Sequence, residues 1–371
     1  MAAGLQVVAA LALSTPMALA QSAGVTEPLV LAPFNRAAPA CAAPTGLNRS
    51  IGFAQDNDRQ FIVGVGYGLG QAAEDRGLEF SARVAANDAA QQAADVDAFA
   101  AEKTGAVIVA PIDAFSLAPH LQQVIWNGGY VGAVVPPPAT TILNAPQYLT
   151  GKTLADAAVR HIEQKLGGKA DVVLLTHDSL QFLAPRFVAM RDVLKDMRDV
   201  RIVADISPAV VSEEGGYETM KLILAANSNV DVVLGADTVV LGALRALRET
   251  GKDRPDQFLG GIDGETEAVS EIKRGDGPYK ASVALSSPVF GYALGQLAAD
   301  WLEGKSVPQA MDILPFALSS ENIAQYEADQ LDPGAVFADP VRRDAYLKMY
   351  GNICADTRDQ YLNFPWSSET R

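Results

Sequence analysis

Residues 51–110 read IGFAQDNDRQFIVGVGYGLGQAAEDRGLEFSARVAANDAAQQAADVDAFAAEKTGAVIVA, and short apolar runs alternate there with longer amphipathic segments. The apolar runs have the length of β-strands, and the segments between them have the length of helices. In the first such segment, 61–76, four apolar residues recur at helical spacing: Ile62, Val65, Leu69 and Ala72. Gly77 then ends the segment, which is typical of a helix C-terminus. The stretch therefore predicts strands and helices in alternation.

The same alternation continues on both sides of the prolines at 136–138 and extends to about residue 303. Repeated strand–helix units with largely apolar strands indicate parallel sheets that are covered by helices on both faces. The proline break divides the units into two sets. The predicted fold class is therefore α/β, with two doubly wound parallel-sheet lobes.

The composition fits a packed protein of this kind. The chain has 371 residues, of which 49% are hydrophobic, and 29 basic side chains stand against 44 acidic ones, for a net charge of -15. At roughly 150 residues per domain, the length corresponds to two or three domains. The negative charge, without a run of Lys or Arg to offset it, repels phosphate backbones, so nucleic acid is not an expected partner.

The N-terminus has the features of a secretory signal. An apolar, uncharged stretch at 5–13 is too short to span a bilayer, and Ala18-Leu19-Ala20 precedes Gln21. This pattern predicts a signal peptide over 1–20 that is cleaved after Ala20, followed by an exposed leader over 21–47 that is rich in Ala, Pro and Thr. No Lys or Arg precedes Leu5, which is also compatible with a start inside a longer signal, and the alternative is a buried N-terminal helix.

Export changes what the two cysteines predict. In an oxidising compartment, Cys41 and Cys354 are candidates for a disulfide that ties the two flanking segments together, whereas the alternative is two unrelated thiols. Three scattered histidines and no paired Cys/His spacing supply no metal ligand set.

Catalytic and cofactor motifs are weak. At the predicted carboxyl ends of the strands, where an open parallel sheet binds ligands, His177 is the sole histidine. A secreted hydrolase using His177 and Asp178 is therefore an alternative, although a histidine at a strand end is more often structural. The glycine run at 64–70 is not a dinucleotide-binding motif, because Leu69 stands where the third glycine is required and the run lies inside the first predicted helix. We interpret these glycines as residues that allow close packing of the helix against the sheet.

Four stretches together resemble a known family. They are IGFAQDN at 51–57 with Phe61, VAPID at 109–113, LGALRAL at 241–247 and GIDG at 261–264. In this order and spacing they are similar to the periplasmic sugar-binding proteins of ABC importers, the ribose-binding-protein-like group with the type I periplasmic binding protein fold. The resemblance covers about 48–308. Repressors with the same fold begin with a helix-turn-helix, whereas this chain begins with the signal-like segment.

The resemblance implies two lobes that are joined by three hinge strands and close on a sugar. The implied division is 48–145 plus 286–309 for the N-terminal lobe, 146–285 plus 310–330 for the C-terminal lobe, and 331–371 for a C-terminal tail. It also implies a set of ligand-binding residues: Asp58, Arg59, Phe61, Arg186, Asp237 and Asp263.

Phe61 would stack on the sugar ring, and Arg186 and Asp263 would bond its hydroxyls. The alternative for Arg186 and Asp263 is a surface ion pair or a helix cap, and for Asp237 it is a cap. The chain departs from the family pattern at Pro136-Pro137, where relatives have an Asp-Arg pair, and at Ala236 and Leu285, where they have amides. A ligand other than ribose is therefore expected: another pentose, a hexose, a polyol or something less polar.

The resemblance implies a monomeric, periplasmic solute receptor that has no catalysis and no cofactor and delivers its ligand to an ABC permease in the inner membrane. The alternative within the same fold is a sensory receptor that serves a membrane kinase or chemoreceptor.

Overall fold

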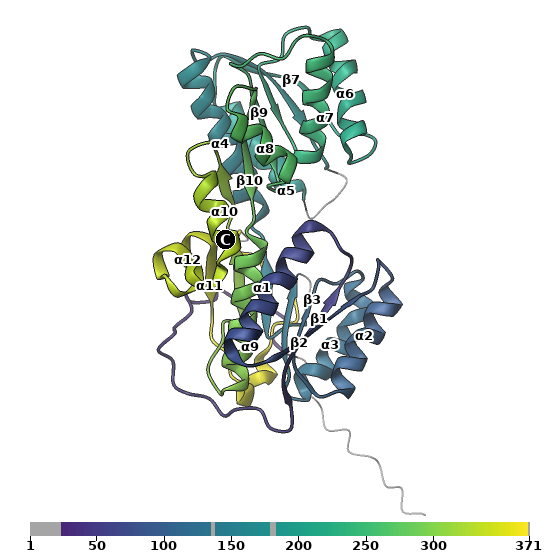
Figure 1. Ribbon diagram of the computed structural model, residues 1–371, viewed down its shortest axis with the longest axis vertical. Helices are drawn as coiled ribbons and strands as arrows, with labels where there is room; N and C mark the ends of the chain where they lie inside the picture. Colours follow the sequence, from purple (N-terminus) through teal and green to yellow (C-terminus); the bar gives the residue numbers. More distant parts are fainter. Residues whose placement is uncertain (1–23, 135–137, 179–182, 370–371) are drawn as a thin grey trace, which may run out of the picture.

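The computed structural model describes residues 24–134, 138–178 and 183–369, which form two lobes stacked end to end (Figure 1). The predicted signal peptide, its cleavage site and the Pro136-Pro137 pair lie outside these residues. Each lobe consists of one twisted sheet with helices on both faces, which confirms the predicted fold class. Among the described residues, no helix is both long and apolar enough to cross a bilayer.

The first lobe is built on a seven-stranded sheet in the order β13-β11-β5-β4-β3-β1-β2. Its strands are β1 (Asn48–Gln55), β2 (Glu79–Val84), β3 (Thr104–Val109), β4 (Tyr130–Val134), β5 (Thr141–Asn144), β11 (Ala310–Ile313) and β13 (Leu347–Tyr350). Neighbouring strands run parallel except for β13, which pairs antiparallel with β11. The covering helices are α1 (Gln60–Arg76), α2 (Ala89–Ala101), α3 (Ala114–Trp126) and α9 (Ser287–Leu302).

Side-chain alternation assigns these helices to the two faces of the sheet. A Cβ at Gly52 would meet Phe99 of α2, whereas a Cβ at Gly132 would meet Leu294 of α9. In the strand register, Gly52 is aligned with Val107 and Gly132 with Ile108, so they face opposite sides. Helices α1 and α9 therefore cover one face, and α2 and α3 cover the other.

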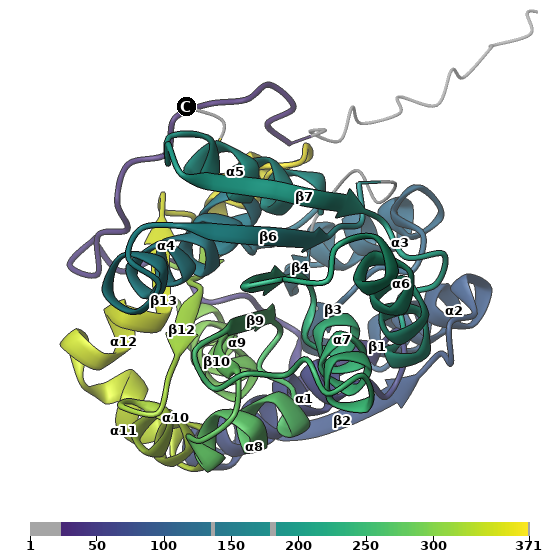
Figure 2. The same cartoon turned by 90° about the horizontal axis from the view of Figure 1, so that it is seen from above.

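The second lobe has a six-stranded sheet in the order β12-β10-β9-β8-β6-β7. Its strands are β6 (Ala170–Leu175), β7 (Val200–Ile206), β8 (Val232–Leu234), β9 (Phe258–Ile262), β10 (Tyr279–Ala284) and β12 (Phe316–Leu318). Its helices are α4 (Gln147–Lys165), α5 (Ala184–Lys195), α6 (Glu213–Ala226), α7 (Asp237–Glu249) and α8 (Thr266–Arg274). Seen from above, α6 and α7 lie on one side of this sheet and α4 on the other (Figure 2).

Three segments connect the lobes: β5 to α4, β10 to α9, and β11 to β12. The family resemblance predicts that the last crossing is at residue 310 and that 310–330 belong to the second lobe. The structure differs here, because β11 pairs with β5 in the first sheet and β12 is the first strand to join the second. The crossing therefore comes after Ile313.

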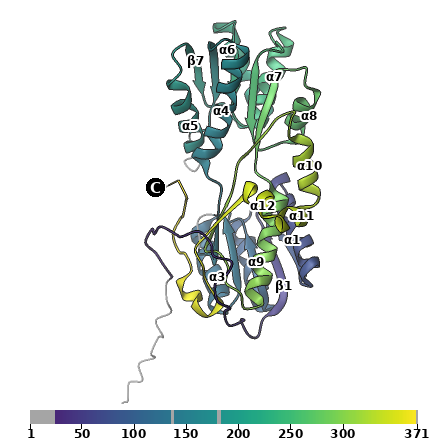
Figure 3. The same ribbon diagram turned by 90° about the vertical axis from the view of Figure 1, so that its left-hand side faces the viewer.

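The C-terminal segment is also part of the first lobe rather than a loose tail. It contains α11 (Pro333–Ala338), α12 (Pro340–Tyr346), β13 and the 3-10 helix η1 (Ala355–Gln360). The preceding helix α10 (Ile323–Leu331) also contacts the second lobe, since Tyr326 stacks on Phe316 of β12 and Glu327 bonds Lys273 of α8. After η1, Tyr361 and Leu362 are fully buried, and Trp366 packs against Tyr350 of β13. The leader follows the outside of the same lobe (Figure 3) and is mostly exposed, although Leu31 is buried.

The glycine run in α1 serves two contacts. A Cβ at Gly68 would lie 2.1 Å from the backbone oxygen of Pro288 in α9, and a Cβ at Gly64 would meet Ser287. Gly66 instead faces Phe53 of the sheet. The predicted helix–sheet packing is thus partly wrong, since Gly64 and Gly68 allow two helices to approach closely.

Candidate functional site

The carboxyl ends of the strands in the two sheets face each other across the junction of the lobes. The Nε2 of Gln60, at the start of α1, donates a hydrogen bond of 3.1 Å to the Oγ1 of Thr266, at the start of α8. This contact joins the first lobe to the second. The residues around it lie where the two lobes meet, and we call this junction the interlobe cleft.

Arg186 and Asp263 form an ion pair on the second lobe. Nη1 of Arg186 lies 3.7 Å from Oδ1 of Asp263, and the Nε of Arg186 donates to Oε1 of Gln147, at the start of α4. Arg186 is 8% exposed, and burial lowers the pKa of its guanidinium while Asp263 opposes that effect. Its Nη atoms make no hydrogen bond to the described residues, so they are donors available at the cleft.

Asp263 occupies a strained backbone position at the end of β9. Its φ of 118° lies in a region that disfavours side chains with a Cβ. Two bonds hold it there: its N–H donates to the Val283 oxygen at 2.9 Å, and the N–H of Gly264 donates to Oγ of Ser282 at 3.0 Å. Strand β10 thus holds this carboxylate in place beside Arg186.

The environment of Asp263 makes its carboxyl group a weaker acid than an ordinary aspartate. Burial between the lobes raises the pKa of Asp263 to about 6, and the charge of Glu265 adds to the effect, whereas Arg186 and Arg59 oppose it. Nevertheless, 47% of the Asp263 side chain is exposed, so it faces the cleft and not the interior of the lobe. A carboxylate in this position can accept bonds from ligand hydroxyl groups.

Asp237 does not reach the cleft. It is fully buried at the start of α7, and its two carboxylate oxygens accept hydrogen bonds from the Tyr279 hydroxyl at 2.7 Å, the Ser282 hydroxyl at 2.7 Å and the Glu265 N–H at 2.9 Å. Burial raises the pKa of Asp237 to about 7, although the bonds from Ser282 and Tyr279 oppose the rise. The structure therefore gives Asp237 a structural role: it anchors the loop that follows Asp263, and the predicted ligand contact is not supported.

The first lobe contributes Asp58, Arg59 and Phe61 at the start of α1. Arg59 is held by Asp56 at 2.5 Å and by Oδ1 of Asn57 at 2.8 Å, with 63% of its side chain exposed. Asp58 is exposed, and Phe61 is half-buried against the core of the lobe. These residues and the Arg186–Asp263 pair lie on opposite sides of the cleft.

An apolar cavity lies beside Phe61, between the first sheet and the layer formed by α1 and α9. Ten residues line it, and all of them are apolar; they include Phe53, Phe61, Ile108, Ala110, Leu143 and Phe290. No local sequence pattern predicts this cavity. Its lining comes from five separate elements and the residue after β3, so only the fold brings the lining together.

Three further residues at the junction, Gln60, Gln147 and Thr266, are not among the predicted site residues. Each is the first residue of a helix at the cleft: α1, α4 and α8, respectively. The predicted helix starts could have indicated these residues as site residues, because the first turn of a helix that follows a strand lies at the carboxyl edge of the sheet.

The hydrolase alternative finds no support in the geometry. Asp178 is bound to Arg191 at 2.5 Å, and Arg191 also bonds Asp205 at 2.6 Å. Both ring nitrogens of His177 are buried and have no hydrogen-bond partner in the described part of the chain. Asp178 therefore does not orient His177 as a catalytic base requires.

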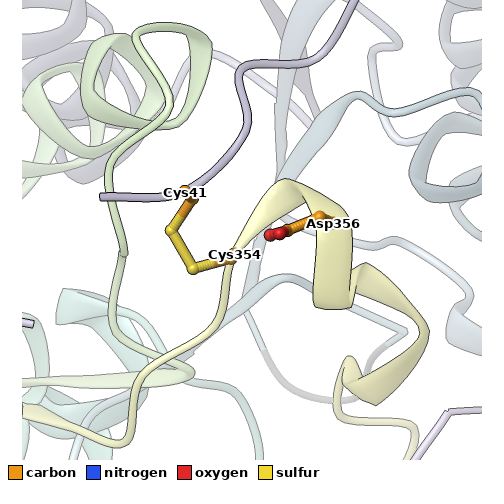
Figure 4. A group of neighbouring side chains, drawn as sticks. All are labelled: Cys41, Cys354 and Asp356. Atoms are coloured by element: carbon orange, nitrogen blue, oxygen red, sulfur yellow. A yellow bond between two sulfur atoms is a disulfide. The ribbon is translucent and has the colours of Figure 1, made fainter. Parts of the chain in front are cut away.

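The predicted disulfide between Cys41 and Cys354 is confirmed (Figure 4). It joins the leader to the segment after β13, across 313 residues of sequence. The Asp356 carboxylate lies within 4.8 Å of both sulfur atoms. A disulfide has no thiolate to offer, so this group is not a metal site.

Comparison with known proteins gives a consistent result. A family model described as periplasmic binding protein domain matches residues 51–306. The xylitol-binding protein of Mycolicibacterium smegmatis is 27% identical over 236 residues, which are 62% of this chain. The match spans 65% of that protein, slightly less than two thirds of its length. The putative rhizopine-binding protein of Rhizobium meliloti is 25% identical over 68% of this chain and 83% of its own length.

Solved structures show the same fold. A periplasmic ribose ABC transporter protein from Conexibacter woesei superimposes with a TM-score of 0.67 at 19% identity, over 76% of this chain and 95% of that chain. The Caulobacter myo-inositol binding protein, bound to myo-inositol, superimposes with a TM-score of 0.60 at 24% identity, over 76% and 97% of the two chains.

Proposed function

The chain belongs to the periplasmic binding protein domain family, and from this premise we propose that it is the solute receptor of an ABC importer, which captures a sugar or polyol between its two lobes. The receptor needs no cofactor and catalyses no reaction. Ligand binding stabilises a closed form of the two lobes, and the closed form is what the permease in the inner membrane recognises.

The observation that carries this proposal is the Arg186–Asp263 pair at the cleft. A guanidinium donates and a carboxylate accepts, so together they bond the vicinal hydroxyl groups of a neutral polyhydroxylated ligand. The names of the relatives support the same ligand class, since they refer to xylitol, rhizopine, ribose and myo-inositol.

The proposed location is the periplasm. The signal-like segment ending at Ala20 directs export, with cleavage after Ala20. The Cys41–Cys354 disulfide supports this location, because such bonds persist in oxidising compartments.

The protein acts as a monomer in this proposal. A sensory receptor that serves a kinase or chemoreceptor remains the alternative, since it has the same fold and binds the same ligands. Growth of a deletion strain on the identified ligand separates the two, because loss of an importer receptor prevents uptake, whereas loss of a sensor removes only the response.

A thermal-shift screen tests the binding function. The panel contains D-ribose, D-allose, xylitol and myo-inositol, with leucine as a control that lacks hydroxyl groups. A ligand at about 100 times its Kd adds roughly 2.7 kcal/mol to the free energy of unfolding of the protein. The melting temperature of the protein therefore rises by several degrees. If no sugar or polyol in an extended panel raises the melting temperature, the proposal is wrong.

A further inference from the structure

The cavity beside Phe61 has one partly exposed end. Phe61 and Ala110 are the half-buried members of its lining, whereas Phe53, Ile108, Leu143 and Phe290 are each at most 2% exposed. Ala110 directly follows β3, and Phe61 directly follows Gln60, which contacts the second lobe. The partly exposed end of the cavity is therefore the end nearest the junction with the second lobe.

The two walls of the cleft differ in polarity at this point. Arg186 and Asp263 on the second lobe supply a cation and an anion, whereas the cavity on the first lobe has an entirely apolar lining. Arg59, on the rim of the first lobe, is already bonded to Asp56 and Asn57. A ligand that fits both walls has hydroxyl groups on one side and an apolar group on the other.

We propose that this cavity takes a methyl group of the ligand, so that the solute is a deoxy sugar or a deoxy polyol. The inference rests on the proposed function and specifies its ligand class. A ligand hydroxyl in the cavity would lose its bonds to water and gain no partner from the apolar side chains. A methyl group in the same place gains apolar burial without that loss.

Calorimetry on matched sugar pairs tests the proposal. Three pairs differ in a single hydroxyl: D-galactose and D-fucose, D-mannose and D-rhamnose, and D-ribose and 5-deoxy-D-ribose. In at least one pair, the deoxy member is expected to bind about fivefold more tightly or better, because it avoids an unpartnered buried hydroxyl.

Two variants at the mouth of the cavity examine its role. Ala110→Leu fills the mouth and is expected to remove the deoxy preference, whereas Ala94→Leu, at an exposed position of α2, is expected to keep it. Ala110→Ser adds one oxygen with little change in volume and is expected to shift the preference toward the hydroxylated member. The serine variant also decides the matter if the leucine variant does not fold.

Three outcomes contradict the proposal, and each identifies a different step of the argument as wrong. If the hydroxylated member binds as tightly as the deoxy member in every pair that binds, the subsite is wrong and the receptor function stands. If Ala110→Leu or Ala110→Ser leaves the ratio unchanged, the cavity is a packing void. If no member of the pairs or of the screening panel binds, the receptor function itself fails, and this inference fails with it.

Discussion

The guanidinium of Arg186 makes a structural hydrogen bond through one nitrogen and directs the others toward the proposed ligand. Its Nε bonds Gln147 and so ties α5 to the first turn of α4, while its Nη atoms point toward Asp263. Because the residue is 8% exposed, water replaces little of what a ligand provides there. Truncation of this side chain should therefore affect both binding and stability.

Arg186→Ala is expected to weaken ligand binding by about tenfold or more, the equivalent of roughly 1.5–3 kcal/mol for a charge-assisted bond. The melting temperature should also fall, since Gln147 loses its donor. Arg201→Ala is the control, because Arg201 forms an exposed ion pair with Asp171. Calorimetry on the ligand identified by the screen measures the effect. Binding within twofold of the parent, together with a lower melting temperature, would leave Arg186 a purely structural role.

Ligand affinity is expected to depend on pH through Asp263. The pKa of Asp263 is raised to about 6, so its ionised form, which accepts hydroxyl bonds, predominates above that pH and is lost as the pH falls through it. The Kd should thus rise up to about tenfold between pH 7 and pH 5. Asp263→Asn should bind more weakly, with a flat profile. If Asp263→Asn keeps the pH dependence, the titrating group is the buried Asp237, whose pKa is about 7.

Sequence reasoning located polar residues at the sheet edges but not the direction of their side chains. The predicted strand ends put Asp237 and Asp263 at the carboxyl edge of the second sheet, where both lie, whereas Arg186 lies in the first turn of α5. Asp237 nevertheless points inward, because its carboxylate accepts hydrogen bonds from Tyr279 and Ser282. These two partners are 42 and 45 residues away in sequence. Such contacts depend on the register of β10, which no local pattern specifies.

At the scale of elements, helical periodicity predicted α1 well but did not reveal what its glycines contact. Gly68 packs against α9, which begins more than 200 residues later in the chain. Conversely, a Cβ at Gly291 of α9 would lie 2.1 Å from the Val65 oxygen of α1. The two helices are thus in near backbone contact on one face of the first sheet, and only small residues allow this.

Two glycines of the same helix should respond oppositely to alanine. Gly68→Ala places a Cβ 2.1 Å from a backbone oxygen, and we expect a loss of about 1–3 kcal/mol in the free energy of unfolding. Gly70→Ala meets only Phe80, at 3.6 Å, so helix propensity should make it neutral or stabilising by up to about 1 kcal/mol. Urea denaturation measures both variants. Equal effects would mean that α1 and α9 are farther apart than described.

At the scale of the whole molecule, the disulfide and the hinge are separate. Cys41 lies in the leader, which is hydrogen-bonded to Gly304, and Cys354 follows β13, so both belong to the first lobe. The three connections between the lobes contain neither cysteine. Closure of the lobes therefore does not strain the bridge.

Removal of the disulfide should lower stability and leave binding intact. Models of chain entropy assign on the order of 5 kcal/mol to a loop of this length, although strain in the native state often reduces the value. The double variant Cys41→Ser with Cys354→Ser is expected to melt several degrees lower and to bind its ligand within about twofold of the parent. Mass mapping of the exported protein without reductant checks the pairing, and two free thiols would contradict it.

The first sheet has a practical consequence for anyone who expresses this protein in pieces. The family match ends at residue 306, yet β11 and β13 lie beyond it and complete one side of the sheet. A fragment that is trimmed to the family boundary would leave β5 as an open edge, with backbone donors and acceptors that invite pairing with another chain. Inclusion bodies from such a fragment would reflect the missing strands, not an unstable core.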